Sequence, residues 1–214
     1  GIIQELKVLL KTKSIGTNSD RALLLDFQAA LETKPEKAIK LEKDALAQIE
    51  NITADNARLV SNLHANLGGL YRINGHPDLA REHMEKSISL LDQFNLLHIN
   101  DSIPQIANYA MFLTEQQEPE RGISELQKLS GIIKEYHSDE CLDYAKVQET
   151  LATIYLMTAN LSHAKTHFKK AFKIYEKIWA DEPEMIEAKY QEIQELYPQI
   201  GFCIGKKLSG LLTK

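Results

Sequence analysis

Several residue types are scarce in this chain, and each scarcity argues against a class of protein. Its 214 residues include two cysteines, ten glycines and six prolines. Cys141 and Cys203 lie 62 positions apart, which fits no paired metal or redox motif, so we interpret both as reduced thiols. No Gly/Ser-rich or low-complexity stretch offers a flexible linker. A run of about 18 apolar residues is also missing, so no membrane span is predicted.

The start of the chain gives little sign of targeting. It has no basic segment followed by an apolar stretch and a small-residue cleavage site, so we expect a cytoplasmic protein. Because it begins with Gly1 and not with methionine, we interpret it as a fragment of a longer polypeptide.

Basic charge is not in excess either. The formal net charge is -5, and basic residues alternate with acidic ones, as in the favourable i,i+4 pair Glu82 and Lys86. Nucleic-acid binding needs a basic stripe, so no nucleic-acid partner is predicted. One predicted helix does carry a row of lysines, which we interpret as a solvated face, with a phosphate-binding stripe as the alternative. These are Lys165, Lys169, Lys170 and Lys173.

Catalytic motifs are missing as well. His163 and His167 are spaced by four, as a helical metal pair would be, but alanine follows the first histidine and no third ligand is near. We interpret them as solvated residues beside a packed face. The sequence therefore predicts no metal, no cofactor and no enzyme. An enzyme acting through these histidines is the alternative, and it would require stoichiometric metal.

What the chain does contain is an internal repeat. Shifting the sequence by 42 residues superimposes Pro35, Pro77, Pro119 and Leu161. A fixed period of this size is typical of repeat architectures. Proline fits the first turn of a helix, so each proline is predicted to start the second helix of an antiparallel pair. At Leu161 the preceding Asn160 can serve as the helix cap.

Other columns of the repeat indicate where the paired helices touch. Small residues recur at Gly68, Ala110 and Ala152, because a larger side chain would push the crossing helices apart. Three residues later the column is large and fills the next layer of the core. A second small column marks the start of each second helix: Ala38, Ala80, Gly122 and Ala164.

These columns resemble the tetratricopeptide repeat family. Its core is Leu-Gly-x-x-Tyr followed by alanine, an aromatic residue and proline. The segment Leu67-Gly68-Gly69-Leu70-Tyr71 matches that core, and Leu151-Ala152-Thr153-Ile154-Tyr155 matches it with alanine for glycine. The usual period is about 34 residues. A period of 42 is similar to the longer repeats of kinesin light chains and of arrays attached to bacterial signalling proteins.

The resemblance implies an all-α fold, a right-handed superhelical solenoid of helix-turn-helix repeats with a C-terminal cap. We expect residues 1–214 to form a single array with units near 18–52, 56–97, 101–137 and 141–181. The first unit has Asp26 at a small position and Glu42 at an aromatic one, so an end cap and a slight misalignment both stay open.

The C-terminal part is predicted to close the array. Capping helices are expected within 183–212, with a break at Pro198. The apolar edge formed by Leu208, Leu211 and Leu212 is expected to dock on the last hairpin, and self-association through this helix is the alternative.

The resemblance also implies a non-catalytic scaffold that holds a protein or peptide partner in a concave groove lined by the first helix of each pair. Asn66 and Asn108 are equivalent in successive units, and their amides can bind the backbone of an extended peptide. Simple exposure of these amides is the alternative. Ile73, Met111 and Met157 would add an adaptable apolar floor. The candidate partner-binding residues are Asn62, Asn66, Arg72, Asn108, Met111, Lys146, Thr150 and Thr153.

This function has two variants. The clamp with which the family holds chaperone C-termini is disfavoured, because Ala65 and Gly69 stand where lysine and asparagine are needed. The second is a sensor: the repeat domain of a larger bacterial regulator that binds a signalling peptide. Nothing in the sequence identifies the partner.

Overall fold

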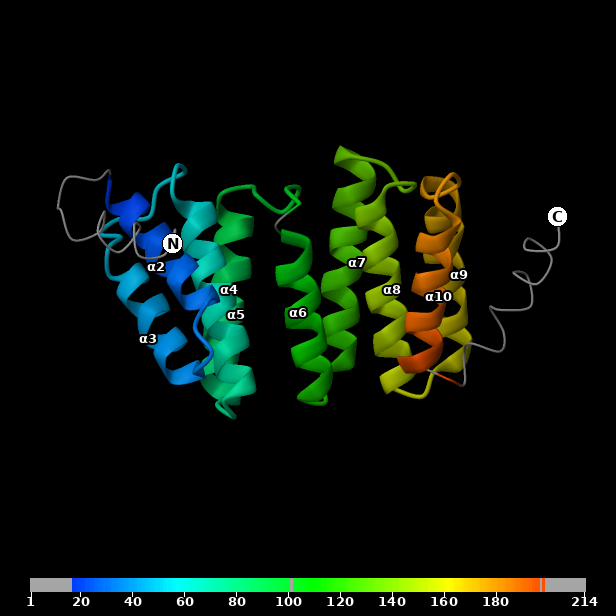
Figure 1. Ribbon diagram of the computed structural model, residues 1–214, viewed down its shortest axis with the longest axis horizontal. Helices are drawn as coiled ribbons and strands as arrows, with labels where there is room; N and C mark the ends of the chain where they lie inside the picture. Colours follow the sequence, from blue (N-terminus) through cyan, green and yellow to red (C-terminus); the bar gives the residue numbers. More distant parts are fainter. Residues whose placement is uncertain (1–16, 101, 197, 199–214) are drawn as a thin grey trace. The chain divides into compact units, whose positions relative to one another are not determined.

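The computed structural model describes residues 17–100, 102–196 and 198 (Figure 1). These residues form α-helices joined by turns, and no strand occurs among them. The helices are α2 (Asn18–Ala30), α3 (Pro35–Leu46), α4 (Ala57–Ile73), α5 (Pro77–Gln93), α6 (Ser102–Glu115), α7 (Pro119–Tyr136), α8 (Leu142–Met157), α9 (Leu161–Ile178) and α10 (Pro183–Leu196). The predicted all-α fold is confirmed. The right-handed superhelical course of the whole array stays a prediction.

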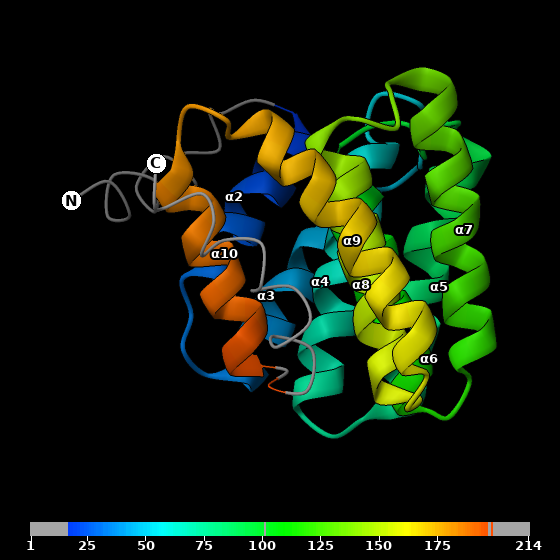
Figure 2. The same cartoon turned by 90° about the vertical axis from the view of Figure 1, so that its right-hand side faces the viewer.

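The chain divides into two compact units, Gly1–Phe112 and Leu113–Lys214. In the first unit α2 packs against α3, α3 against α4, and α4 against α5. In the second unit α7 packs against α8, and α8 against α9. Figure 2 shows α10 beside α9, which it also contacts. A single array over residues 1–214 therefore stays an expectation.

The repeat frame predicted from the prolines is confirmed. Pro35, Pro77 and Pro119 each occupy the first turn of a second helix, at the start of α3, α5 and α7. At the start of α9 the side chain of Asn160 accepts a hydrogen bond from the backbone N–H of His163. The departure at Leu161 is thus compensated by the cap that the sequence offers.

The turns before α5, α7 and α9 share a feature that the sequence columns did not reveal. Gly75, Gln117 and Ala159 are equivalent in the 42-residue frame, and all three have a left-handed backbone, with φ of 76°, 65° and 58°. In each case the next N–H bonds back to a carbonyl five residues earlier, at 2.9, 2.8 and 2.7 Å. This is the Schellman ending of a helix. The carbonyls belong to Tyr71, Leu113 and Tyr155, the large column of the repeat.

The predicted close helix crossing is confirmed at Gly68. A Cβ atom at this position would lie 2.5 Å from Cγ of Met84, 3.2 Å from the Met84 nitrogen and 3.3 Å from the Ala80 carbonyl oxygen. Gly69 meets nothing within 4 Å in the same test. The small column thus marks where α4 touches α5, and its neighbour faces open space.

Among the described residues, the array begins with the α2–α3 hairpin and ends with α10. The α2–α3 hairpin keeps the repeat frame, because α3 starts at Pro35. This agrees with an end unit and not with misalignment. The predicted helix after residue 183 is confirmed as α10, which ends at Leu196. The continuation to 212, with Cys203 and the edge of Leu208, Leu211 and Leu212, lies outside the described residues.

Candidate binding surface

The predicted partner-binding residues all lie on first helices, in two separate units. Within the first unit α4 carries Asn62, Asn66 and Arg72, and α6 carries Asn108 and Met111. Within the second unit α8 carries Lys146, Thr150 and Thr153. We call these two sets, with the exposed apolar residue at the end of α4 or α8, the first-helix surfaces.

Asn66 has internal partners that the sequence did not indicate. Its side-chain amide donates to Asp26 Oδ1 of α2 at 2.8 Å and to Glu42 Oε1 of α3 at 3.2 Å. The two acidic residues that break the repeat pattern of the first unit are therefore the acceptors for this amide. Asn66 and the equivalent Asn108 on α6 are both exposed, but Asn66 also joins the first hairpin to α4.

Glu42 is the unusual member of this cluster. Only 2% of it is exposed, and no hydrogen-bond partner is found for its Oε2 among the described residues. Burial raises the pKa of Glu42 to about 8, and the nearby charge of Asp26 adds to the rise. Glu42 thus holds a proton at neutral pH and can share it with Asp26. Glu42 is therefore a buried acid at a position where the repeat pattern expects an aromatic residue.

Asn62 also makes an internal contact. Its Oδ1 accepts from Nε2 of Gln105, which lies on α6. The Gln105 Oε1 accepts in turn from the hydroxyls of Ser61 at 2.8 Å and Ser87 at 2.6 Å. Both serines and Gln105 are buried, so this network fixes α6 against α4 and α5 with its polar groups satisfied.

On α8 the predicted residues form one line along the helix. Lys146 pairs with Asp143 at 3.6 Å, and the hydroxyls of Thr150 and Thr153 donate to the carbonyls of Lys146 and Glu149. The hydroxyl protons are therefore used inside the helix, while the oxygens can still accept from a ligand.

Glu149 lies beside this line and tethers α10. It accepts from the hydroxyl of Tyr175 at 2.6 Å and pairs with Lys189 at 3.0 Å. The ammonium group of Lys189 also lies 5.9 Å from the centre of the Tyr175 ring. The cap is thus attached to α8 by a half-buried ion pair, which is stronger than an exposed one.

A histidine cluster recurs in both units. In the first, Nδ1 of His64 lies 2.9 Å from Nδ1 of His83, whose ring stacks on Tyr71. In the second, Gln148 replaces the first histidine: its Oε1 accepts from Nδ1 of His167, at 2.8 Å, and the His167 ring stacks on Tyr155.

These imidazoles are half-buried, and burial changes their acid–base behaviour. It lowers the pKa of His64 and of His167 to about 4, and it lowers the pKa of His83 as well. The rings are therefore neutral at pH 7 and serve as packed polar links between first and second helices. His163 is exposed as predicted, but the expectation of a solvated His167 is wrong, because Gln148 and Tyr155 cover it.

The described residues contain no group of three or more His, Cys, Asp or Glu side chains arranged to hold a metal ion. Over the same residues, no helix combines the length and apolar composition required to cross a bilayer.

With this geometry established, comparisons with known proteins identify the repeat. A model of the tetratricopeptide repeat family matches residues 102–177. This chain has a tetratricopeptide-like repeat fold. The match covers the two units whose second helices start at Pro119 and Leu161. Tetratricopeptide-like repeat proteins generally mediate protein–protein interactions.

Solved structures share the fold at low sequence identity. BtubC (BKLC) from P. vanneervenii is 16% identical, with a TM-score of 0.72 over 99% of this chain and 88% of that one. A Podosopora anserina protein described as a kinesin light chain with nearly identical TPR-like repeats is 14% identical, with a TM-score of 0.69 over 83% and 87%. MamA is 15% identical, with a TM-score of 0.56 over 83% and 88%. A search of the curated proteins gives no match.

Proposed function

We propose that this protein is a non-catalytic scaffold that binds a peptide segment of a protein partner on its first-helix surfaces. The observation that carries the proposal is the exposure of apolar side chains at equivalent positions. Ile73 ends α4 and is 77% exposed, and Met157 ends α8 and is 46% exposed. They are two repeat periods apart. Large apolar residues recurring at the exposed end of a first helix favour contact with a ligand.

The first unit also offers polar groups on its first helices. Asn108 presents an exposed amide on α6, and Met111 is half-buried next to it. Gly69 on α4 leaves open space where a Cβ would stand, so a ligand can approach the backbone there. This combination suits a peptide whose backbone pairs with an amide and whose apolar side chain covers Ile73.

The second unit offers a different set. Thr150 and Thr153 can accept from peptide N–H groups, because their own protons are directed into the helix. The exposed Lys146 can attract an acidic residue, and Met157 adds a flexible apolar contact. The proposal therefore concerns two surfaces of related design, each within its own unit.

The proposal can be tested with peptides selected on the purified protein by display from a random library. Dissociation constants of the selected peptides would be measured by fluorescence anisotropy against Ile73→Ser and Met157→Ser. Burying one such side chain contributes about 1.5–3 kcal/mol, so at least one of the two variants should bind about tenfold more weakly or worse.

Exposed apolar residues on second helices provide matched controls. Leu79 on α5 and Ile178 on α9 are each 40% exposed. Leu79→Ser and Ile178→Ser should leave affinity within about twofold of the unsubstituted protein, as surface changes outside the contact do. Selected peptides that respond to the control variants, and not to Ile73→Ser or Met157→Ser, would contradict the assignment.

A further inference from the structure

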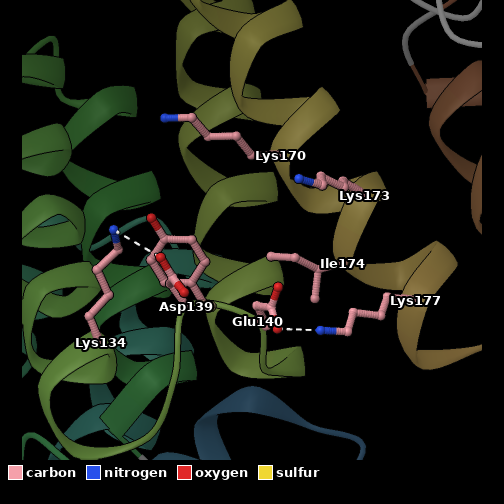
Figure 3. A pocket seen from close by; sticks show the side chains of 8 residues that line it. Lys134, Asp139, Glu140, Lys170, Lys173, Ile174 and Lys177 are labelled. Carbon is pink, nitrogen blue, oxygen red and sulfur yellow. Dashed lines mark hydrogen bonds and ion pairs between the residues drawn. The ribbon is translucent and has the colours of Figure 1, made fainter.

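A pocket of about 290 Å³ opens in the second unit, away from the proposed peptide-binding residues. Its walls come from the end of α7, the α7–α8 turn, the start of α8 and the second half of α9 (Figure 3). The lining residues are Lys134, Asp139, Glu140, Tyr144, Lys170, Lys173, Ile174 and Lys177. We call it the lysine pocket.

The lysine pocket is basic, although the chain as a whole is acidic. Four lysines and two carboxylates line it, which leaves a formal charge of +2, whereas the whole chain carries -5. Figure 3 shows Lys134 on one side and three lysines of α9 on the other, with Asp139 and Glu140 between them. Apart from Ile174 and Tyr144, every lining residue carries a charge, so the lysine pocket favours a charged ligand over an apolar one.

The four lysines are not equivalent. Lys134 pairs with Asp139 at 3.3 Å and lies 5.3 Å from the centre of the Tyr144 ring, and Lys177 pairs with Glu140. Lys170 and Lys173 have no carboxylate partner among the described residues. Being three residues apart on α9, they lie on the same side of the helix. As far as the described residues go, the lysine pocket therefore holds two cations that no carboxylate compensates, on one side of α9.

The two paired lysines can contribute as well. Both members of each ion pair are at least half exposed, with side-chain exposures of 50% and 56% for Lys134 and Asp139, and of 62% and 59% for Lys177 and Glu140. Exposed pairs of this kind contribute only about 0–1 kcal/mol, so an incoming anion can compete for their ammonium groups.

From this arrangement we propose that the lysine pocket binds a phosphate monoester through Lys170 and Lys173. A phosphate monoester carries a charge of about -1.5 to -2 at pH 7 and three acceptor oxygens, which match the excess charge and the ammonium donors. A single carboxylate would neutralise only half of the excess. The lysine row first interpreted as a solvated face thus divides into two lysines that line a pocket and two, Lys165 and Lys169, that do not.

This site is independent of the proposed peptide-binding function, because it uses other residues of the second unit. Two sources could supply the ligand: a phosphorylated side chain of a partner protein or free phosphate compounds. Both present the same group to the pocket, and the probes below distinguish them.

The test is isothermal titration of the full chain, at low ionic strength, with inorganic phosphate and with a short blocked peptide carrying one phosphoserine. We expect a Kd of about 1 mM or tighter for at least one probe and weaker binding as salt is added. Tighter binding of the phosphopeptide would indicate a phosphorylated protein segment, and equal binding would indicate a site for the phosphate group alone. The unphosphorylated peptide should not bind.

Two double variants on α9 distinguish binding in the lysine pocket from non-specific electrostatic attraction of the anion to the helix. Lys170→Gln with Lys173→Gln should weaken binding about tenfold or more, because two charge-assisted hydrogen bonds are lost. Lys165→Gln with Lys169→Gln removes the same charge from α9 outside the pocket and should change affinity by about twofold at most. Lys170→Arg with Lys173→Arg should retain binding. Absence of binding by both phosphate probes, or equal weakening by the two glutamine pairs, would overturn the proposal.

Discussion

Replacing Gly68 with alanine tests whether the close α4–α5 crossing is the reason for a small residue at this column of the repeat. The new Cβ would lie 2.5 Å from Cγ of Met84, a side chain that is only 4% exposed and has little room to move. It would also stand 3.2 Å from the Met84 nitrogen and 3.3 Å from the Ala80 carbonyl oxygen. Since two of these neighbours are backbone atoms, relief requires α4 and α5 to separate and not merely a change of rotamer.

The expected magnitude follows from two opposing terms. Overpacking a close contact costs about 1–3 kcal/mol, whereas alanine gains about 1 kcal/mol over glycine in a helix interior. Gly68→Ala should therefore lower the free energy of unfolding by up to about 2 kcal/mol. Gly69→Ala is a matched control, because its Cβ meets nothing within 4 Å and only the helix gain applies. The two variants should differ by about 1–3 kcal/mol, since the helix term cancels.

The assay is urea unfolding followed by helical circular dichroism at one protein concentration. Repeat arrays can unfold in steps, but both substitutions lie in the same helix, so their difference is measured within one unit. A Gly68→Ala protein as stable as Gly69→Ala would refute the argument that the small column exists to let the helices touch.

Three further predictions concern the polar clusters of the first unit. Asn66→Ala should lower the free energy of unfolding by about 1–2 kcal/mol, because two carboxyl groups lose their donor. Asn108→Ala, the control, should change it by about 0.5 kcal/mol at most. Equal thermal midpoints of the two variants would argue against the internal role of Asn66. Because burial lowers the pKa of His64 from 6.5 to about 4, and also lowers that of His83, the unfolded chain binds more protons in this window. The contribution of these histidines to stability should therefore fall as the pH is lowered from 6.5 to 4, and His64→Gln, which copies the second unit, should reduce that fall. Glu42 has the opposite sign: its pKa is raised from 4.5 to about 8, so the stability that its protonated form contributes is full below 4.5 and is lost as the pH rises through 8. Glu42→Gln should remove this loss between pH 4.5 and 8. Chemical unfolding at a series of pH values measures both the histidine and the Glu42 effects.

The repeat frame could be predicted from the sequence because packing imposes it. Proline at the start of a helix and a small residue at a crossing are local requirements, so Pro77 and Gly68 recur at fixed spacing. The left-handed turns escaped prediction at Gln117 and Ala159, since neither is the glycine that favours this backbone. The left-handed backbone at these two residues could have been predicted from their equivalence to Gly75 in the 42-residue repeat, but not from their residue types.

The candidate surface was predicted only in part. Helical periodicity shows which face of α4 is polar, but it does not show which neighbouring helix that face meets. Asn66 therefore looked like a ligand-binding residue, although its acceptors Asp26 and Glu42 lie 40 and 24 positions away. Gln105 was missed because a single glutamine in a helix carries no signal of burial. The lysine pocket was missed for a similar reason, since the turn between α7 and α8 brings Lys134 to the lysines of α9.

The measurement that tests the central claim most directly is the methyl spectrum of the protein labelled with 13C-methyl methionine, recorded with and without a selected peptide. The chain contains four methionines. Met111 and Met157 lie on the first-helix surfaces, Met84 is buried at the α4–α5 crossing, and Met185 is on α10. Binding should shift Met111 if the peptide occupies the first unit and Met157 if it occupies the second, with Met84 unchanged. If a saturating peptide shifts neither the Met111 nor the Met157 methyl resonance, binding on the first-helix surfaces is contradicted.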